Sequence, residues 1–223
     1  MGQAQVCATV AAKSMLDLRA QRDRAQGADL VELRLDAVGD LDVDGALAGR
    51  TCPVLVTCRP TWEGGHFAGS EEERHRILRR AFELGADWVD LEWRGGFEKL
   101  IAERHGQNVV LSMHDFNGMP DDLDQRYRAM RGSGADVVKL AVQPHSATDI
   151  VRLLRLGQTK RNERLVVVGM GQIGVPTRLL PSHFGSCWTY AGAGVAPGQI
   201  PLKVMIEEFR CRQITAATAI YGV

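Results

Sequence analysis

Residues 108–141 read NVVLSMHDFNGMPDDLDQRYRAMRGSGADVVKLA and contain a complete strand, helix, strand pattern. Two runs rich in branched apolar residues, Asn108–His114 and Asp136–Ala141, have the length of β-strands. Between them lies a helical pattern whose apolar residues share one face, namely Leu123, Tyr127 and Met130. Because parallel strands require a crossover of this kind, the stretch predicts a βαβ unit.

The same alternation extends over the rest of the chain. Six further strands are predicted at Gln5–Val10, Asp29–Leu35, Pro53–Cys58, Asp87–Glu92, Leu165–Gly169 and Ser186–Tyr190. The helical patterns between them include Glu71–Leu84, which begins with a capping box of Ser70 and Glu73, and a last helix carrying Leu202, Met205, Ile206 and Phe209. Eight such units predict one (β/α)8 TIM barrel domain over residues 1–223, with an open doubly wound sheet as the alternative.

Composition excludes several other classes of protein. The 223 residues are 45% hydrophobic and 24% charged, as in ordinary globular proteins. Because 27 basic residues balance 27 acidic ones, no net field attracts nucleic acid or an anionic membrane. The chain contains no apolar run of the ~20 residues that span a bilayer. We therefore expect a small-molecule partner.

The cysteines are five in number and widely spaced, at Cys7, Cys52, Cys58, Cys187 and Cys211. None forms a C-x-x-C pair, so the pattern predicts reduced thiols in the cytoplasm and no metal site.

Polar residues occupy alternate positions near the C-terminal ends of several predicted strands. They are Glu32, Arg34 and Asp36, then Thr57 and Arg59, then Asp90 and Glu92, then Ser112 and His114, and finally Lys139. An antiparallel sheet with one wet face would also alternate, but the helices between the strands argue against it. Inside a barrel, charges are tolerated only when they are paired or surround a ligand. The pattern favours a shared polar site, with structural ion pairs as the alternative.

Lys139 is one of only five lysines and lies in the middle of an apolar strand. Burial and nearby cations would free its amine to attack a carbonyl group. The alternative is a structural lysine that extends out of the barrel or pairs with Glu32 or Glu92. His114 ends the preceding strand on the same face and is placed to move a proton, while Glu63 follows the third strand and is placed to orient that imidazole.

Three arginines, Arg34, Arg59 and Arg178, end or follow strands and suit a carboxylate or phosphate. The glycine-rich run Gly169–Gly174 resembles a phosphate loop, although such a pattern alone is a weak signal. These residues together predict imine chemistry on a small anionic ketone or aldehyde, with proton transfer beside the carbonyl carbon. They leave open whether water is eliminated or a carbon–carbon bond is cleaved.

Several motifs, in order along nearly the whole chain, resemble those of type I 3-dehydroquinate dehydratase, the Schiff-base enzyme of the shikimate pathway. Glu32–Asp36 resembles the E-x-R-x-D segment, and Thr57–Gly65 resembles T-x-R-x-x-x-E-G-G. Ser112–Phe116 and Ala135–Lys139 are similar to the blocks with the histidine and the imine lysine. The last two matching segments are Met170–Arg178, similar to M-G-x-x-G-x-x-S-R, and Ala196–Gln199, similar to A-P-G-Q.

The resemblance implies that Lys139 forms an imine with 3-dehydroquinate, that His114 moves protons and that Glu63 supports His114. It implies substrate contacts from Glu32, Arg34, Arg59, Arg178, Gln199 and, where the family often has serine, Thr9. It further implies syn elimination of water to 3-dehydroshikimate in aromatic amino acid biosynthesis, no metal or cofactor, and a homodimer.

The sequence departs from the family pattern at Val195, where the family usually has serine, so a hydroxyl contact from the closing loop is missing or supplied elsewhere. Thr177 replaces serine before the arginine and keeps the hydroxyl. Two rival interpretations stay open from the residues alone. One is a class I aldolase, which also forms a lysine imine in a barrel. The other is a catalytically silent barrel that binds a metabolite.

Overall fold

The computed structural model describes residues 5–160, 162–214 and 218. Residues 1–4, 161, 215–217 and 219–223 of the predicted 1–223 domain lie outside the described residues. Within the described part, no helix is long and apolar enough to cross a membrane.

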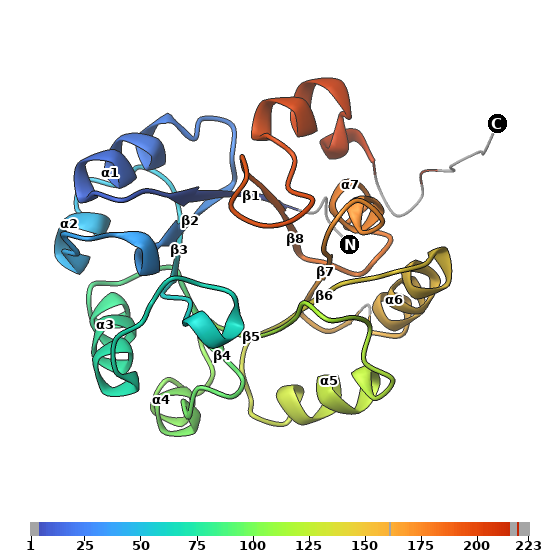
Figure 1. Ribbon diagram of the computed structural model, residues 1–223, viewed down its shortest axis with the longest axis horizontal. Coiled ribbons are helices and arrows are strands. Elements are labelled where there is room, and N and C mark those ends of the chain that lie inside the picture. Colours follow the sequence, from blue (N-terminus) through green and yellow to red (C-terminus); the bar gives the residue numbers. More distant parts are fainter. Residues whose placement is uncertain (1–4, 161, 215–217, 219–223) are drawn as a thin grey trace.

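Eight parallel strands form the centre of the molecule, and the helices surround them as an outer ring (Figure 1). The strands are β1 (Gln5–Ala11), β2 (Leu30–Arg34), β3 (Val54–Thr57), β4 (Trp88–Glu92), β5 (Val109–Asp115), β6 (Val137–Val142), β7 (Leu165–Gly169) and β8 (Trp188–Ala191). The helices are α1 (Met15–Arg24), α2 (Val43–Leu47), α3 (Glu71–Glu83), α4 (Glu98–Glu103), α5 (Leu123–Arg131), α6 (Ala147–Thr159) and α7 (Val175–Leu179). Each predicted strand is found within two residues of its predicted ends.

The strands pair in the order β7-β6-β5-β4-β3-β2-β1-β8, so only the seam between β7 and β8 lacks a regular ladder. At that seam, the N–H of Cys187 donates to the carbonyl of Leu165 at 2.9 Å. The N–H of Val167 donates to the hydroxyl of Ser186, also at 2.9 Å. These bonds bring the first and last strands of the pairing order together and confirm the (β/α)8 barrel rather than an open sheet.

Alternation along each strand separates two cores. On β6, Val138 and Leu140 belong to the outer core that packs against the helices, whereas Val137 and Ala141 face the barrel interior. The interior is apolar at the N-terminal ends of the strands, where the ring of Trp188 lies 5.6 Å from that of Trp88. Because apolar side chains fill this end, the polar side chains of the interior gather toward the C-terminal ends of the strands.

Three strands begin with the same Gly-Ala-Asp turn, at residues 27–29, 85–87 and 134–136. In each turn the aspartate accepts a hydrogen bond from a backbone N–H at the start of the preceding strand. Asp29 binds the N–H of Val6 at 2.7 Å, Asp87 that of Val54 at 2.9 Å, and Asp136 that of Asn108 at 2.9 Å. This repeated anchor starts β2, β4 and β6 at a common level of the barrel.

Two details of the helices refine the sequence predictions. At the start of α3, Ser70 accepts from the N–H of Glu73 at 3.2 Å, so the serine half of the predicted capping box is formed. The predicted last helix differs, because Val204–Glu208 forms a π-helical turn, η3, in which the N–H of Phe209 binds the carbonyl of Val204. The wider turn rotates Phe209 away from the buried Met205, and Phe209 is 47% exposed.

Candidate active site

The centre of the site is one layer of four side chains from alternate strands: Glu32 on β2, Asp90 on β4, Lys139 on β6 and Tyr190 on β8. The first three stand three residues after the aspartates of the repeated turn. The amine of Lys139 lies 2.9 Å from Oδ2 of Asp90 and 3.7 Å from Oε1 of Glu32. It also lies 4.5 Å from the centre of the Tyr190 ring. The layer therefore surrounds a buried amine with two carboxylates and an aromatic face.

Hydroxyl groups from the next layer hold the two carboxylates in place. Thr9 and Thr57 each donate to Glu32 at 2.9 Å, one to each carboxylate oxygen. Ser112 donates to Oδ1 of Asp90 at 2.5 Å. Burial alone would raise the pKa of Asp90, but the neighbouring Arg59 and Lys139 hold that pKa below its ordinary value. Asp90 is therefore a permanent anion beside the amine.

His114 and Glu63 form a second unit above this layer. Nδ1 of His114 lies 2.8 Å from Oε2 of Glu63, which belongs to the short turn η2 (Thr61–Glu63) after β3. Burial, together with the cations of Arg59 and Lys139, lowers the pKa of His114 well below its ordinary value. Burial also raises the pKa of Glu63 to about 8. Both shifts favour the uncharged forms near neutral pH, so this pair can exchange a proton at little cost.

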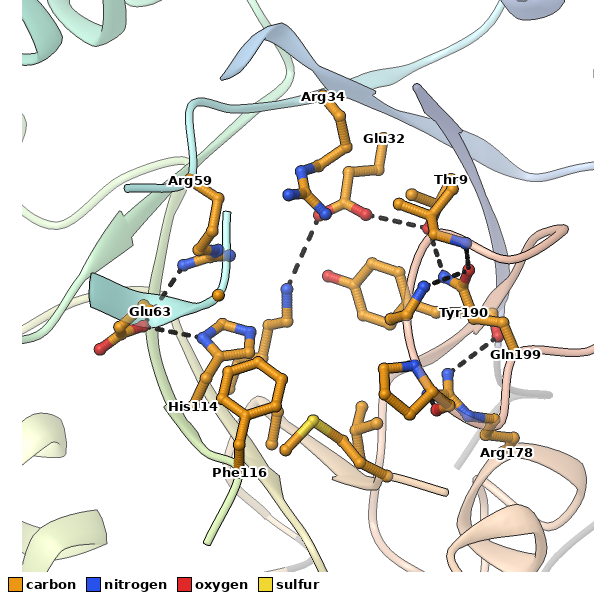
Figure 2. Close-up of a pocket in the computed structure, with 18 residues that line it drawn as sticks. Thr9, Glu32, Arg34, Arg59, Glu63, His114, Phe116, Arg178, Tyr190 and Gln199 are labelled. Atoms are coloured by element: carbon orange, nitrogen blue, oxygen red, sulfur yellow. Dashed lines mark hydrogen bonds and ion pairs between the residues drawn. The ribbon is translucent and has the colours of Figure 1, made fainter. Parts of the chain in front are cut away.

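The three predicted arginines surround the cavity but have different partners (Figure 2). Arg34 is fixed by two hydrogen bonds of 2.8 Å to Asp36, and Arg59 contacts carboxylates of β4. Arg178, across the cavity from Arg59, donates to the carbonyls of Pro197 at 3.1 Å and Tyr190 at 3.4 Å.

Arg178 is 2% exposed, and among residues 5–160, 162–214 and 218 no carboxylate lies within ion-pair distance of it. Its Nε atom is buried and has no hydrogen-bond partner. Burial lowers the pKa of Arg178 to about 10, so the guanidinium is still charged at neutral pH. A buried cation in this state is suited to an anionic ligand.

The loop after β8 closes one side of the cavity. Oε1 of Gln199 accepts from the N–H groups of Val195 at 3.2 Å and Ala196 at 3.1 Å. Nε2 of Gln199 donates to the hydroxyl of Thr9 at 3.2 Å. The N–H of Gly171 is occupied by the carbonyl of Pro197, so this amide of the glycine-rich run points at the closing loop. Val195 lines the cavity with an apolar side chain.

All nine residues predicted as the site line one cavity at the C-terminal ends of the strands. They are Thr9, Glu32, Arg34, Arg59, Glu63, His114, Lys139, Arg178 and Gln199. Their individual roles stay predictions. Within the described residues, no group of three or more histidine, cysteine, aspartate or glutamate side chains is arranged to hold a metal ion.

Known proteins are similar to this chain over most of its length. The family model described as type I 3-dehydroquinase matches residues 6–216. The chain belongs to the type I 3-dehydroquinase family. A 3-dehydroquinate dehydratase of Methanothrix thermoacetophila is 34% identical over 86% of this chain and 85% of its own length. The solved structure of 3-dehydroquinate dehydratase from Geobacillus kaustophilus is 30% identical, with a TM-score of 0.82 over 95% of this chain and 91% of that one.

A longer relative is also similar. The bifunctional 3-dehydroquinate dehydratase/shikimate dehydrogenase of Arabidopsis thaliana is 33% identical over 98% of this chain, which spans 39% of that protein. The similarity therefore covers only part of that longer protein.

Sequence reasoning placed Asp90 in the shared polar site without giving it a role and did not name Tyr190 there, although both lie beside the amine of Lys139. The repeated Gly-Ala-Asp turn is the signal that identifies Asp90, because Asp90 holds the same position in its repeat as Glu32 and Lys139. The proposed pairing of Lys139 with Glu92 is wrong, since Glu92 binds Arg59 and Arg74 instead. Phe116, which stacks on His114 with ring centres 6.4 Å apart, is another residue of this cavity that the prediction omitted.

Proposed function

We propose that Lys139 forms an imine with the ketone of 3-dehydroquinate and that His114 moves the protons of the dehydration. Membership of the family makes the reaction that of 3-dehydroquinate dehydratase, a hydro-lyase of the shikimate pathway and of aromatic amino acid biosynthesis. The observation that carries the assignment of roles is the buried amine of Lys139, held 2.9 Å from Asp90 at the base of the cavity.

The reaction has three stages, which are imine formation, elimination and hydrolysis. The amine attacks the ketone carbon and one water leaves, which gives an iminium ion. Because the iminium withdraws electrons, the neighbouring C–H becomes acidic, and loss of this proton is followed by departure of the hydroxyl group from the next carbon as water. A water molecule then hydrolyses the imine, releases 3-dehydroshikimate and restores the amine. One water is lost overall.

The pair of His114 and Glu63 supports both directions of proton transfer. When Glu63 is ionised, Nδ1 of His114 carries the proton and donates to it, which leaves Nε2 free to act as a base. When Glu63 holds the proton, it donates to Nδ1, and Nε2–H acts as an acid. Once Nε2 has taken a proton from the substrate, transfer of the Nδ1 proton to Glu63 leaves Nε2–H as an acid and the imidazole without a buried charge.

The arginines and polar groups of the cavity suit the rest of the substrate. Among the three arginines of the cavity, Arg178 is the one without a carboxylate partner within the described residues, and we assign it to the substrate carboxylate. Arg34 and Arg59 are already bound to Asp36, Asp90 and Glu92, which leaves them with fewer free N–H groups for hydroxyl or carbonyl oxygens. Glu32, Gln199 and Thr9 are assigned to substrate hydroxyls.

One experiment tests these roles. The protein is mixed with 3-dehydroquinate, the enone absorbance of 3-dehydroshikimate is followed, and borohydride is then added to reduce any imine. We expect product formation and an adduct that peptide mapping places on Lys139, both absent in Lys139→Ala. Absence of product and adduct in the unmodified protein would overturn the assignment, and an adduct without product would favour a silent binder.

The remaining assignments concern the whole chain. A single catalytic domain over residues 1–223 and a homodimer are supported by the resemblance to the family, and light scattering after gel filtration tests the dimer. All five cysteines are free thiols, which supports a reducing cytoplasmic location.

A further inference from the structure

Arg74 is a buried arginine on the outer helix α3 and does not line the cavity. Its side chain is fully buried, with the guanidinium 4.9 Å from the centre of the Phe97 ring. A Cβ atom on Gly95 would lie 2.7 Å from Nη2 of Arg74, so the chain after β4 leaves space for this group only because residue 95 is glycine. An arginine this enclosed must have its charge compensated nearby.

Part of the compensation is Glu71 on the same helix, a half-exposed side chain whose Oε2 lies 2.5 Å from Nη2 of Arg74. The rest is a chain of five alternating buried charges that runs from α3 to the amine of Lys139. Arg74 contacts Oε2 of Glu92 through Nη1, and Oε1 of Glu92 lies 2.7 Å from Nη1 of Arg59. Nη2 of Arg59 lies 3.0 Å from Oδ1 of Asp90, whose Oδ2 lies 2.9 Å from the amine of Lys139. Each carboxylate bridges two cations with its two oxygens.

Resting on the proposed function, we propose that Arg74 is a positioning residue for the reaction. By binding one oxygen of Glu92, it directs the other oxygen at Arg59 and so fixes Arg59 between Glu92 and Asp90. By supplying the terminal positive charge of the chain, it offsets a carboxylate that would otherwise favour the protonated amine. Arg74 acts through these groups and does not touch the substrate.

Glu71 is half exposed and therefore screened by solvent, so the five buried groups of the chain decide the charge around the amine. With a protonated amine the chain has three cations and two anions, and with a free amine it is neutral. Removing Arg74 makes the chain neutral with a protonated amine and negative with a free one. Attack on the ketone requires the free amine, so loss of Arg74 disfavours the reactive form. The effect reaches the amine because buried charges are weakly screened.

Other titratable or charged groups also face Lys139, and none of them is in an ion pair with Arg74, whose carboxylate partners are Glu71 and Glu92. They are Cys7 on β1, Glu32 on β2, Asp90 on β4, His114 on β5 and Tyr190 on β8, with Arg59 and Glu63 beyond them.

The test compares the pH dependence of kcat/KM in four variants. In Arg74→Met we expect kcat/KM at neutral pH to fall roughly 10- to 100-fold and the acidic limb of the profile to move up by roughly half a unit to one unit. Arg74→Lys, which keeps the charge, should return the limb close to its original position. Glu92→Gln should move the limb downward, and the double variant Arg74→Met/Glu92→Gln should restore it.

Arg22→Met is the matched control for stability. Arg22 is 4% exposed on α1 and donates to the carbonyls of Ala46 and Ala48, with no contact to the five-charge chain. We expect this variant to lower Tm without moving the acidic limb.

If the acidic limb of the kcat/KM profile lies at the same pH in all Arg74 and Glu92 variants, the inference is overturned and Arg74 is a structural residue. If Arg74→Met fails to fold, the difference between the acidic limbs of Glu92→Gln and of the double variant still measures the effect of losing Arg74. Failure of the unmodified protein to form product or adduct would instead count against the proposed function.

Discussion

The imidazole of His114 and the carboxyl group of Glu63 lie within one hydrogen bond, with 2.8 Å between Nδ1 and Oε2, in a place where burial favours the neutral form of both. Two side chains that are hydrated and titrate at their ordinary pKa values in the unfolded chain thus become a proton-sharing pair in the folded one. The pair links the fold to the reaction, because the pKa shifts that suit proton transfer also make the folded state sensitive to pH.

The raised pKa of Glu63 sets the direction in which the free energy of unfolding changes with pH. Its pKa rises from 4.5 to about 8 on folding, so between these values the folded protein binds a proton that the unfolded chain has lost. The free energy of unfolding therefore falls as pH rises through this window. We expect Glu63→Gln, which cannot ionise, to gain about 2 to 4 kcal/mol over the unmodified protein at pH 8 and little at pH 5. Urea unfolding at both pH values measures the difference.

The prediction fails if the stability difference between Glu63→Gln and the unmodified protein is the same at pH 5 and pH 8, because Glu63 then titrates normally in the folded state. The proton exchange proposed for His114 would then lose its physical basis.

Asp90 is the negative charge beside the proposed imine, and removing that charge should slow the reaction. Its Oδ2 lies 2.9 Å from the amine of Lys139, where the positive charge of the iminium develops. Asp90→Asn keeps the shape of the side chain but loses the charge, so we expect kcat to fall about 100-fold and the borohydride-trapped adduct to decrease. The matched control is Asp87→Asn, which weakens the bond to the N–H of Val54 and the contact with Arg50 at 3.7 Å and should lower stability with kcat retained. Wild-type kcat in Asp90→Asn would contradict the role assigned to Asp90.

The fold was largely predictable because its signals are local. The eight strands are short apolar runs bounded by turns, and the alternation within Asp136–Ala141 correctly placed Lys139 inside the barrel. The site residues were predictable to the extent that strand ends determine which side chains meet. Glu63, after β3, and His114, on β5, come from alternate strand ends and do form a pair.

Other parts of the site depend on tertiary structure. The partner of Lys139 is decided by which side chains share a level of the barrel, so Asp90, rather than Glu92, lies beside it. Arg74 follows three glutamates on a charged helix and has the sequence pattern of an exposed residue, yet it is fully buried. The closing loop is held by hydrogen bonds to backbone carbonyls and N–H groups, which leave no pattern in the side chains.

Arg178 predicts a separation of substrate binding from stability. Because it is buried without a carboxylate partner in the described part of the chain, it contributes little to folding but has a strong field for an anion. We expect Arg178→Met to raise KM about 30-fold, equivalent to about 2 kcal/mol of binding, with Tm unchanged or raised. Arg178→Lys should recover part of the affinity. Steady-state kinetics and thermal unfolding measure both effects, and a fall in Tm with unchanged KM would make Arg178 a structural residue.

Thr9 predicts how the closing loop is joined to the centre of the site. Its hydroxyl accepts from Nε2 of Gln199 at 3.2 Å and donates to Glu32 at 2.9 Å, so one side chain connects the loop to the layer that surrounds Lys139. Thr9→Val keeps the volume and removes both bonds. We expect KM to rise about 10-fold and the backbone amides of residues 192–199 to exchange faster with deuterium, since the loop loses a bond to the barrel. Thr9→Ser keeps the hydroxyl and is the matched control. Unchanged exchange and KM in Thr9→Val would show that the loop is held by the carbonyl of Pro197 alone, through its bonds to Gly171 and Arg178.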